Sequence, residues 1–495
     1  MNDVKCASPV AYELFHRGTL AFSEIEAAGM RIDVTYLDKT ITETEQRITS
    51  LEGKLKECDE YKLQRRRYGS ETNLTSREQL AAVLYDDMKL PCESYTSGGK
   101  SKKRRPQLDE SALERTGLKY ARGFLKMEKL NKLLGTYLRG VRREVEDDGF
   151  LHVFNNLHTA HSYRGSNSDI NFQNIPVRDP EIGKLIRTAF IPRSDEYVLV
   201  ESDFSSQEVK VACNLCVDPT LIHDTYEGDM HRDMAAECFM LPVQKVTKAI
   251  RSAAKSGFVF AEFYGDWHKQ VAQNLWASSI GLTDTDGTRI EDHLSALGIT
   301  ELGECDPNAK AVKGTFEHHI MQVEDRFWNT RFRVYNTWRQ ERVRQYRSRG
   351  WFELVTGFVC AGVFSKNQVM NLHIQGPAFH CMLWTMIQLV AELKKRKMRS
   401  RVIGQIHDSI VGDVHKKELD DYAELVTRIA TKDIMDEWKW ITVPLGVEIE
   451  VGEQNWYSKV KYPKTTITYV ACGDTGCNSK GGECVPCRAN GRIKQ

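Results

Sequence analysis

The sequence predicts a mixed α+β fold divided into two or more subdomains, and three observations support this prediction. The chain has 495 residues, which is more than a single hydrophobic core usually serves. Apolar residues recur every three or four positions over residues 11–55 and 113–146, as on long amphipathic helices. Short apolar runs within residues 197–200 and 401–414 are typical of strands.

The composition is that of a folded protein without a membrane segment. Hydrophobic residues make up 41% of the chain and the net charge is only +1, so any affinity for nucleic acid must come from local basic clusters. No apolar run approaches the roughly 18 residues of a membrane span, and the first ten residues lack the apolar core of a signal peptide. We therefore expect a cytoplasmic protein with no membrane partner.

The N-terminal part of the chain predicts a long antiparallel helical arm. Its first helical pattern, over residues 11–55, is interrupted at Gly29. Residues 91–106 are rich in Ser, Gly, Lys and Arg and indicate a mobile loop at the tip of the arm. This loop carries a basic run, which is either a solvated surface or a contact to DNA phosphates. The run consists of Lys100, Lys102, Lys103, Arg104 and Arg105.

Three further segments lie between the two predicted strands. Residues 242–264 have helical periodicity. Residues 281–313 are polar and rich in Gly, Asp and Thr, which indicates an inserted or mobile segment. Residues 326–350 place aromatic and basic residues on two faces of a helix. Such a helix either packs its aromatic face on a core or binds single-stranded nucleic acid.

The cysteines do not indicate a disulfide framework, because thirteen of them are scattered through a long chain with no secretion signal. Four cluster in the tail from residue 457 to 495, which contains seven Lys and Arg residues and only two acidic residues. Their C-x4-C-x6-C-x2-C spacing predicts a small structural zinc site, with a redox or unpaired set as the alternative. The four are Cys472, Cys477, Cys484 and Cys487.

Asp203 and Asp408 are the first candidates for catalysis. Each lies where a predicted strand meets a turn. Phosphoryl or nucleotidyl transfer needs two divalent cations about 3.5–4 Å apart, and two aspartates on adjacent strands are a common way to hold them. The alternative is that both residues only end strands or cap helices.

A second candidate group lies on the predicted helix 242–264. Arg251 and Lys255 are one helical turn apart on one face, and aromatic residues continue toward Tyr264. An arginine fork and a lysine point charge beside stacking rings suit a triphosphate that carries a base. An ordinary surface helix explains the two cations, but it explains the aromatic run less readily.

Several segments, in the correct order, resemble DNA polymerase family A, the DNA polymerase I-like enzymes. Residues 159–178 resemble the family's T-x-x-R…N-L-Q-N-I-P stretch, residues 203–210 its motif A, and residues 229–231 the D-I-H that follows. Residues 251–265 resemble motif B, and residues 405–411 resemble motif C, preceded by a Q-G pair at 375–376. The resemblance covers about residues 11–456, and phage-encoded members look most similar, which implies the cytoplasm of a bacterial host.

The resemblance implies a right-hand polymerase fold with thumb, palm and fingers, an antiparallel palm sheet and a small Cys-rich tail. The expected thumb and the start of the palm take residues 1–157, with the basic tip loop at 97–106. The palm follows in residues 158–213 with motif A and again in 351–456 with motif C. The fingers take residues 214–350, with motif B and an insertion near 281–313, and the tail takes residues 457–495. The implied activity is template-directed extension of a primer 3′-OH with dNTPs by two-metal-ion nucleotidyl transfer.

The resemblance also implies roles for individual residues. Asp203 and Asp408 would bind two Mg²⁺ ions with the Phe204 carbonyl, and Lys255 would act in catalysis on the leaving pyrophosphate. The incoming nucleotide would contact His231, Arg251, Lys255, Glu208, Phe260, Tyr264 and Phe204. Primed template DNA would contact Arg164, Gln173, Arg178, Gln375, His407 and the basic run of residues 100–105.

The chain departs from the family pattern in two places. Ser409 stands where most members have glutamate, a form found in single-subunit RNA polymerases, so RNA synthesis is the alternative activity. Glu208 favours DNA, because it would occupy the space of a ribose 2′-OH. The interval from Lys255 to Tyr264 is one residue too long, which predicts a helix bulge and leaves Val259 or Phe260 as the sugar contact, with Phe260 favoured.

The residues before the thumb are too few for a proofreading exonuclease, which usually needs on the order of 100–200 residues. We therefore expect that proofreading is absent or comes from a separate exonuclease, and that a helicase-primase or clamp protein is a further candidate partner. A polymerase-like scaffold that binds primed DNA without copying it is the non-enzymatic alternative.

Overall fold

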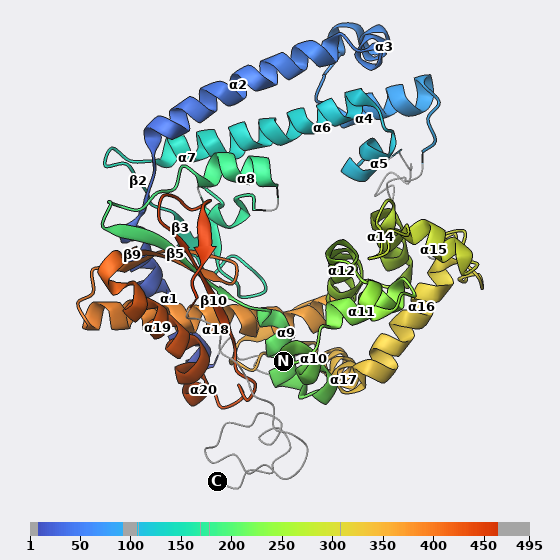
Figure 1. The fold of residues 1–495 in the computed structure, drawn as a ribbon. Helices are drawn as coiled ribbons and strands as arrows, with labels where there is room; N and C mark the ends of the chain where they lie inside the picture. Colours follow the sequence, from blue (N-terminus) through green and yellow to red (C-terminus); the bar gives the residue numbers. More distant parts are fainter. Residues whose placement is uncertain are drawn as a thin grey trace.

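The structure is a computed structural model that describes residues 8–92, 106, 108–168, 170–177, 179–306 and 308–463. Figure 1 shows three parts: a helical arm at the top, a sheet with its helices at the left and below, and a helical lobe at the right. The basic run of residues 100–105, Arg178 and the four tail cysteines lie outside the described residues. DNA contacts by this run and by Arg178, and zinc in the tail, stay predictions.

The N-terminal helices begin and end where their capping residues predict helix boundaries. Pro9 follows the capping Ser8 at the start of α1, and Gly29 ends α1 with φ +61°. Asp33 caps α2, whose apolar stripe packs on α6. Helix α1, Pro9–Ala28, lies outside the arm and packs on the long helix α18, Lys366–Lys395, below the sheet (Figure 1). The arm helices are α2 Val34–Lys56, α3 Asp59–Tyr68, α4 Arg77–Ala82, α5 Glu110–Arg115, α6 Lys119–Lys132 and α7 Arg139–Glu144.

The predicted strands join a five-stranded antiparallel sheet with the order β11-β10-β5-β9-β8. Its strands are β5 Tyr197–Phe204, β8 Arg401–Ile406, β9 Ser409–His415, β10 Val447–Gly452 and β11 Lys459–Lys461. Three two-stranded pairs surround it: β1 Met30–Arg31 with β2 Phe150–Leu151, β3 Phe154–Asn156 with β4 Ser166–Ser168, and β6 Trp351–Glu353 with β7 Val359–Ala361. The expected hairpin at 401–414 is thus confirmed.

Both faces of the central strand β5 are covered, because its buried residues alternate between two cores. Val198, Val200 and Phe204 belong to the main core together with residues of α18, whereas Leu199 packs in the core at the base of the arm. The long helix α18, Lys366–Lys395, begins at a capping box of Ser365 and runs below the sheet (Figure 1). Helices α8 Pro180–Arg187, α9 Gln207–Cys216, α19 Leu419–Arg428 and α20 Ile434–Glu437 complete this part.

The lobe is helical, and the described residues of its segment 281–313 form turns and one helix, while its assignment as an inserted or mobile segment stays a prediction. A bridge joins Thr283 to Arg289, and α15 buries Ile290 and Leu294. The polar residues of this segment serve turns and helix ends. The helices of the lobe are α10 Pro219–Tyr226, α11 Met230–Cys238, α12 Lys248–Ala254, α13 Phe260–Tyr264, α14 His268–Ser279, α15 Ile290–Ala296, α16 Phe316–Arg326 and α17 Arg333–Arg349.

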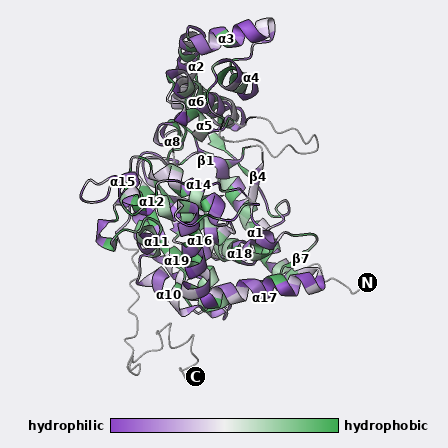
Figure 2. Cartoon of the chain, turned by 90° about the vertical axis from the view of Figure 1, so that its right-hand side faces the viewer, coloured by the Kyte–Doolittle hydropathy of each residue, from purple (hydrophilic) through white to green (hydrophobic). Residues whose placement is uncertain are grey.

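The aromatic face predicted for residues 326–350 is part of the core. Phe327, Trp328, Phe332 and Tyr335 are buried, so the core-packing alternative is confirmed. The outer side of α17 is hydrophilic, as Figure 2 shows. Across the part of the chain that the structure describes, no helix has both the length and the apolar character that a membrane crossing requires.

Candidate active site

The two candidate aspartates lie next to each other at the end of the sheet. Asp203 is the penultimate residue of β5, and Asp408 lies in the turn between β8 and β9. Antiparallel pairing places Asp203 opposite Ser409, and the backbone N–H of Phe204 donates to the Asp408 carbonyl at 3.2 Å. The pairing of β5 with β9 therefore joins two residues that are distant in the sequence.

Neither carboxylate has an ion-pair partner in the described ranges, and their exposure differs, since Asp408 is half-buried and Asp203 is exposed. Burial raises the pKa of Asp408 to about 6, with Arg164 opposing this shift and Glu208 and Asp203 adding to it. Burial also raises the pKa of Asp203, although the Ser409 hydroxyl donates to Oδ1 at 2.7 Å. Two adjacent carboxylates with hard oxygen donors fit divalent cations, which would supply the missing positive charge.

These aspartates open onto a cavity of about 830 Å³. Its walls come from the 160–173 loop, the end of β5, α9, α13, α17, α18 and the β8–β9 turn. The lining residues are Ala160, Ser162, Arg164, Gly165, Gln173, Asp203, Phe204, Ser206, Gln207, Glu208, Val209, Ala212, Lys255, Phe260, Phe263, Tyr264, Tyr335, Asn371, Ile374, Gln375, Phe379, Gln405, His407 and Asp408. The cavity thus brings together most of the predicted site residues that lie in the described part of the chain.

The helix that carries Lys255 has the bulge predicted from its spacing. Residues Lys255–Val259 form a π-helical turn between α12 and α13. The extra residue rotates the helix so that Val259 is fully buried while Phe260 lines the cavity. The Lys255 ammonium lies 5.2 Å from the centre of the Phe260 ring, and no ion pair of Lys255 occurs within the described part of the chain.

Two predicted nucleotide contacts do not line the cavity. Arg251 donates from Nε to both carboxylate oxygens of Asp229 at 2.9 and 3.0 Å. Asp229 in turn caps α11, and the following His231 packs edge-on against Phe260. Burial, together with Lys255 and Arg251, lowers the pKa of His231 to about 4. In this arrangement Arg251 is held by its partner, and His231 is neutral near pH 7.

Glu208 lies in the first turn of α9 and contacts residues from two other segments. The Tyr264 hydroxyl donates to Oε2 of Glu208 at 3.1 Å, and Nη1 of Arg164 lies 3.8 Å from Oε1. Ser206, with φ +51°, turns the chain sharply between β5 and α9. Burial, with Glu208, raises the pKa of Tyr264 to about 12, so this hydroxyl stays a donor.

A row of amides continues from the aspartates along the floor of the cavity. Gln173 donates to Oε1 of Gln405 at 2.8 Å, and Gln405 donates to the His407 carbonyl at 2.6 Å. Burial and Arg164 lower the pKa of His407. Gln405 and Tyr335 were not predicted as site residues, although both lie in segments singled out above. Their inward direction depends on strand alternation and helix phase.

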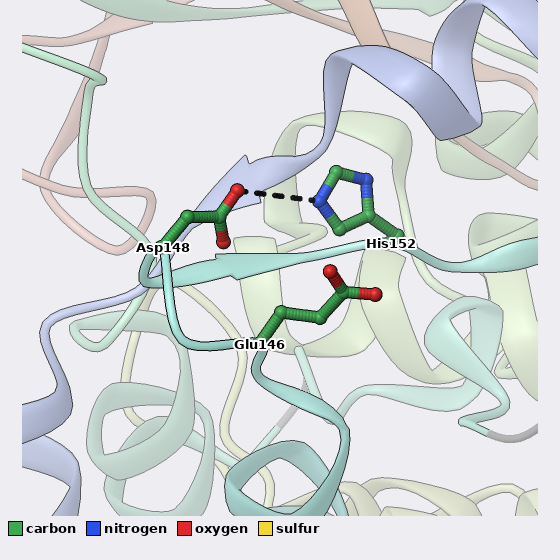
Figure 3. A group of neighbouring side chains, drawn as sticks. All are labelled: Glu146, Asp148 and His152. Carbon is green, nitrogen blue, oxygen red and sulfur yellow. Dashed lines mark ion pairs between the residues drawn. The ribbon is translucent and has the colours of Figure 1, made fainter.

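A separate group of Glu146, Asp148 and His152 lies near the base of the arm (Figure 3). Their ligand atoms lie within 4.8 Å of one another, and Nε2 of His152 is 3.9 Å from Asp148. The other ring nitrogen of His152 lies 2.5 Å from the Glu26 carbonyl. Both acids are exposed and none of the three residues lines the cavity, so an exposed ion pair accounts for the group.

Comparison with known proteins agrees with this geometry. The sequence model of DNA polymerase family A matches residues 35–286 and 346–458. DNA polymerase I of Bacillus subtilis is 26% identical over 441 residues, and the thermostable DNA polymerase I of Thermus aquaticus is 30% identical over 450 residues. The matches cover 88% of this chain but only 44% and 47% of these relatives. The chain therefore spans less than half the length of the curated relatives it matches.

The fold is similar to that of a solved polymerase domain. The POL domain of Pol1 from M. smegmatis, in complex with DNA primer-template and dNTP, has a TM-score of 0.69 to this chain. The sequences are 24% identical, and the match covers 90% of this chain and 70% of that one. With the family model matched over most of its length, the chain belongs to DNA polymerase family A.

Proposed function

We propose that this protein is a template-directed DNA-dependent DNA polymerase that extends a primer 3′-OH with dNTPs. The observation that carries the proposal is the cavity itself, which Asp203 and Asp408, two adjacent carboxylates without an ion-pair partner in the described residues, line together with Lys255, Phe260 and Glu208. A binding scaffold would need the cationic side chains but not the two adjacent carboxylates. The arm, the sheet and the lobe then correspond to the thumb, palm and fingers of a right hand.

The chemistry follows from the positions of these groups. The primer 3′-OH gives up its proton to water, and its oxygen forms a bond to the α-phosphorus of the dNTP while the bond to the leaving pyrophosphate breaks. Mg²⁺ ions bound by Asp203, Asp408 and the Phe204 carbonyl would activate the 3′-oxygen and neutralise the developing charge. Lys255 binds the phosphates and supports the leaving group. Arg251 and His231 join the phosphate contacts after the Asp229 pair opens as α12 and α13 close.

The other walls of the cavity suit base-pair and sugar selection. Minor-groove acceptors are nearly the same for all Watson–Crick pairs, so Arg164, Gln173, Gln375 and His407 can sense pair geometry without reading sequence. Phe260 contacts the sugar, and Tyr264 lies beside the nascent pair. Glu208 occupies the position from which it excludes a 2′-OH.

Primer extension tests the proposal directly. A primed DNA template and Mg²⁺ are incubated with dNTPs or with rNTPs in separate reactions. Template-dependent extension with dNTPs alone supports the proposal. Extension with rNTPs as efficient as with dNTPs assigns the chain to RNA synthesis, the alternative raised by Ser409, and extension with neither nucleotide supports the scaffold.

Glu208→Ala is expected to admit ribonucleotides. Removing the side chain frees the space of a 2′-OH and also removes the acceptor of the Tyr264 hydroxyl. We expect the ratio of kcat/KM for dNTP over rNTP to fall by roughly 10²-fold, which is about the discrimination that one hydroxyl supports in a packed pocket. Single-nucleotide kinetics measure this ratio. Glu227→Ala, at an exposed acid beyond α10, is the control and should leave it unchanged.

A further inference from the structure

The loop that brings Arg164 into the cavity has an unusual backbone. Tyr163 has φ +54°, a left-handed conformation that a bulky side chain rarely adopts. Arg164 and Gly165 follow it and line the cavity, where Arg164 pairs with Glu208 at 3.8 Å. The direction of the Arg164 side chain therefore depends on how the peptide group of Tyr163 is held.

Hydrogen bonds from the backbone and the side chain hold Tyr163. Its N–H donates to the Ala160 carbonyl at 2.9 Å, and its hydroxyl donates to the Val359 carbonyl at 2.5 Å. Its own carbonyl lies 3.2 Å from Nε2 of His380 on α18. The first two contacts hold the incoming chain and the ring, whereas the third acts on the peptide group that leads to Arg164.

The surroundings of His380 define its hydrogen bonds. The ring is fully buried, stacks on Phe358 at 4.2 Å, and has Nδ1 2.6 Å from the Thr356 hydroxyl. A carbonyl oxygen only accepts, so Nε2 carries the hydrogen, and Nδ1 accepts from Thr356. Burial lowers the pKa of His380 to about 3, and the ring is therefore neutral throughout the usual assay range.

A second histidine on the same helix shows that these contacts are not general. His373 is also buried and stacks on Phe352 at 4.4 Å. Its Nδ1 bonds the Val369 carbonyl within its own helix. His373 thus has the packing of His380 without a hydrogen bond to the 163–165 loop in the described structure. The packing of a buried ring alone does not require the contact to Tyr163.

We propose that His380 is a positioning residue for sugar selection, which holds the Tyr163 carbonyl so that Arg164 points at Glu208. Thr356 supports it by fixing the hydrogen on Nε2. This proposal rests on the function proposed above, because it assigns His380 to the same nucleotide site. Arg164 then steadies the Glu208 carboxylate against the position of a 2′-OH, and loss of His380 weakens this discrimination without removing any group that touches the nucleotide.

Equilibrium binding tests this proposal without requiring catalysis. A primer ending in a dideoxynucleotide forms a ternary complex, and the Kd for the next dNTP and rNTP is measured by titration. His380→Leu is expected to lower the rNTP/dNTP ratio of Kd values by roughly ten- to hundredfold, the scale of an effect from a misplaced contact. In His380→Gln the side-chain amide reaches about as far as Nε2 and can donate to the Tyr163 carbonyl. This variant should therefore keep most of the wild-type ratio that His380→Leu loses. Thr356→Val keeps the shape and should lower the ratio by less.

His373→Leu is the matched control, because it removes a buried stacked histidine from the same helix and should leave the ratio unchanged. An unchanged ratio in both His380→Leu and Thr356→Val, or an equal loss in His373→Leu, overturns the proposal. If the wild type binds dNTP selectively but does not extend a primer, the proposed function fails while the ratio still tests His380. If the wild type selects neither nucleotide, both proposals are overturned.

Discussion

Asp408→Asn is expected to reduce primer extension by at least about 10³-fold, because a metal-held transition state loses several kcal/mol and each 1.36 kcal/mol is tenfold. The substitution keeps the shape of the side chain and the backbone bond from Phe204. Binding of primed DNA should therefore persist. Steady-state extension with Mg²⁺, beside a DNA-binding titration, measures both properties.

The same substitution is expected to stabilise the protein in the absence of metal. Burial raises the folded-state pKa of Asp408 to about 6, whereas an unfolded aspartate titrates near 3.9. The folded state therefore binds more protons between these values, and its stability falls as the pH rises from about 4 to about 6. At pH 8 in EDTA, Asp408→Asn removes a penalty of about 2–3 kcal/mol.

Denaturant unfolding at pH 4 and pH 8 checks this sign. The variant should be more stable than the wild type at pH 8 in EDTA, and the difference should vanish near pH 4. Added Mg²⁺ should stabilise the wild type alone, because only its folded state binds the ion. Asp195→Asn, at an exposed position before β5, is the control for both assays. If Asp408→Asn extends primers at a rate within tenfold of the wild-type rate, Asp408 is not a catalytic residue.

The positions of the two candidate aspartates could be predicted from the sequence because local patterns determine them. An apolar run ending at an acid predicts β5 with Asp203, and two apolar runs around a turn predict the hairpin with Asp408. The bulge after Lys255 follows from counting residues, since one extra position between two inward side chains has to be absorbed in the helix. Each of these features depends on residues that are close to one another in the sequence.

Contacts between distant segments could not be predicted in this way. The pairing of Arg251 with Asp229 depends on how α11 lies against α12, and it decides whether the arginine faces the cavity. The contact of His380 with Tyr163 depends on the left-handed backbone conformation of Tyr163, and the sequence does not indicate this conformation because tyrosine rarely adopts it. The burial of Ile290, Leu294 and Ile299 in segment 281–313 likewise depends on packing against other parts of the chain.

Lys269→Met tests what keeps that segment in place. Lys269 and Glu317 are both buried, with Nζ 3.5 Å from the carboxylate, and Lys269 also donates to the carbonyls of Asp306 and Ala309. Removing the lysine leaves a buried carboxylate uncompensated, which typically costs about 3–5 kcal/mol. We expect a loss of this size in the free energy of unfolding, measured with denaturant.

The charge, and not the side-chain volume, should account for most of this loss. Adding Glu317→Gln to Lys269→Met removes the unpaired charge but keeps an acceptor for the Cys305 N–H, so stability should largely return. Arg344→Met, which breaks an exposed pair with Glu341, should cost no more than about 0.5 kcal/mol. If the double variant is as unstable as Lys269→Met, the buried pair does not hold the segment.

The loss of Lys269 should also affect nucleotide binding. Leu275, on the same helix α14, packs against Gly257 in the bulge after Lys255. Because a loosened α14 no longer holds this bulge in place, the KM for dNTP should rise.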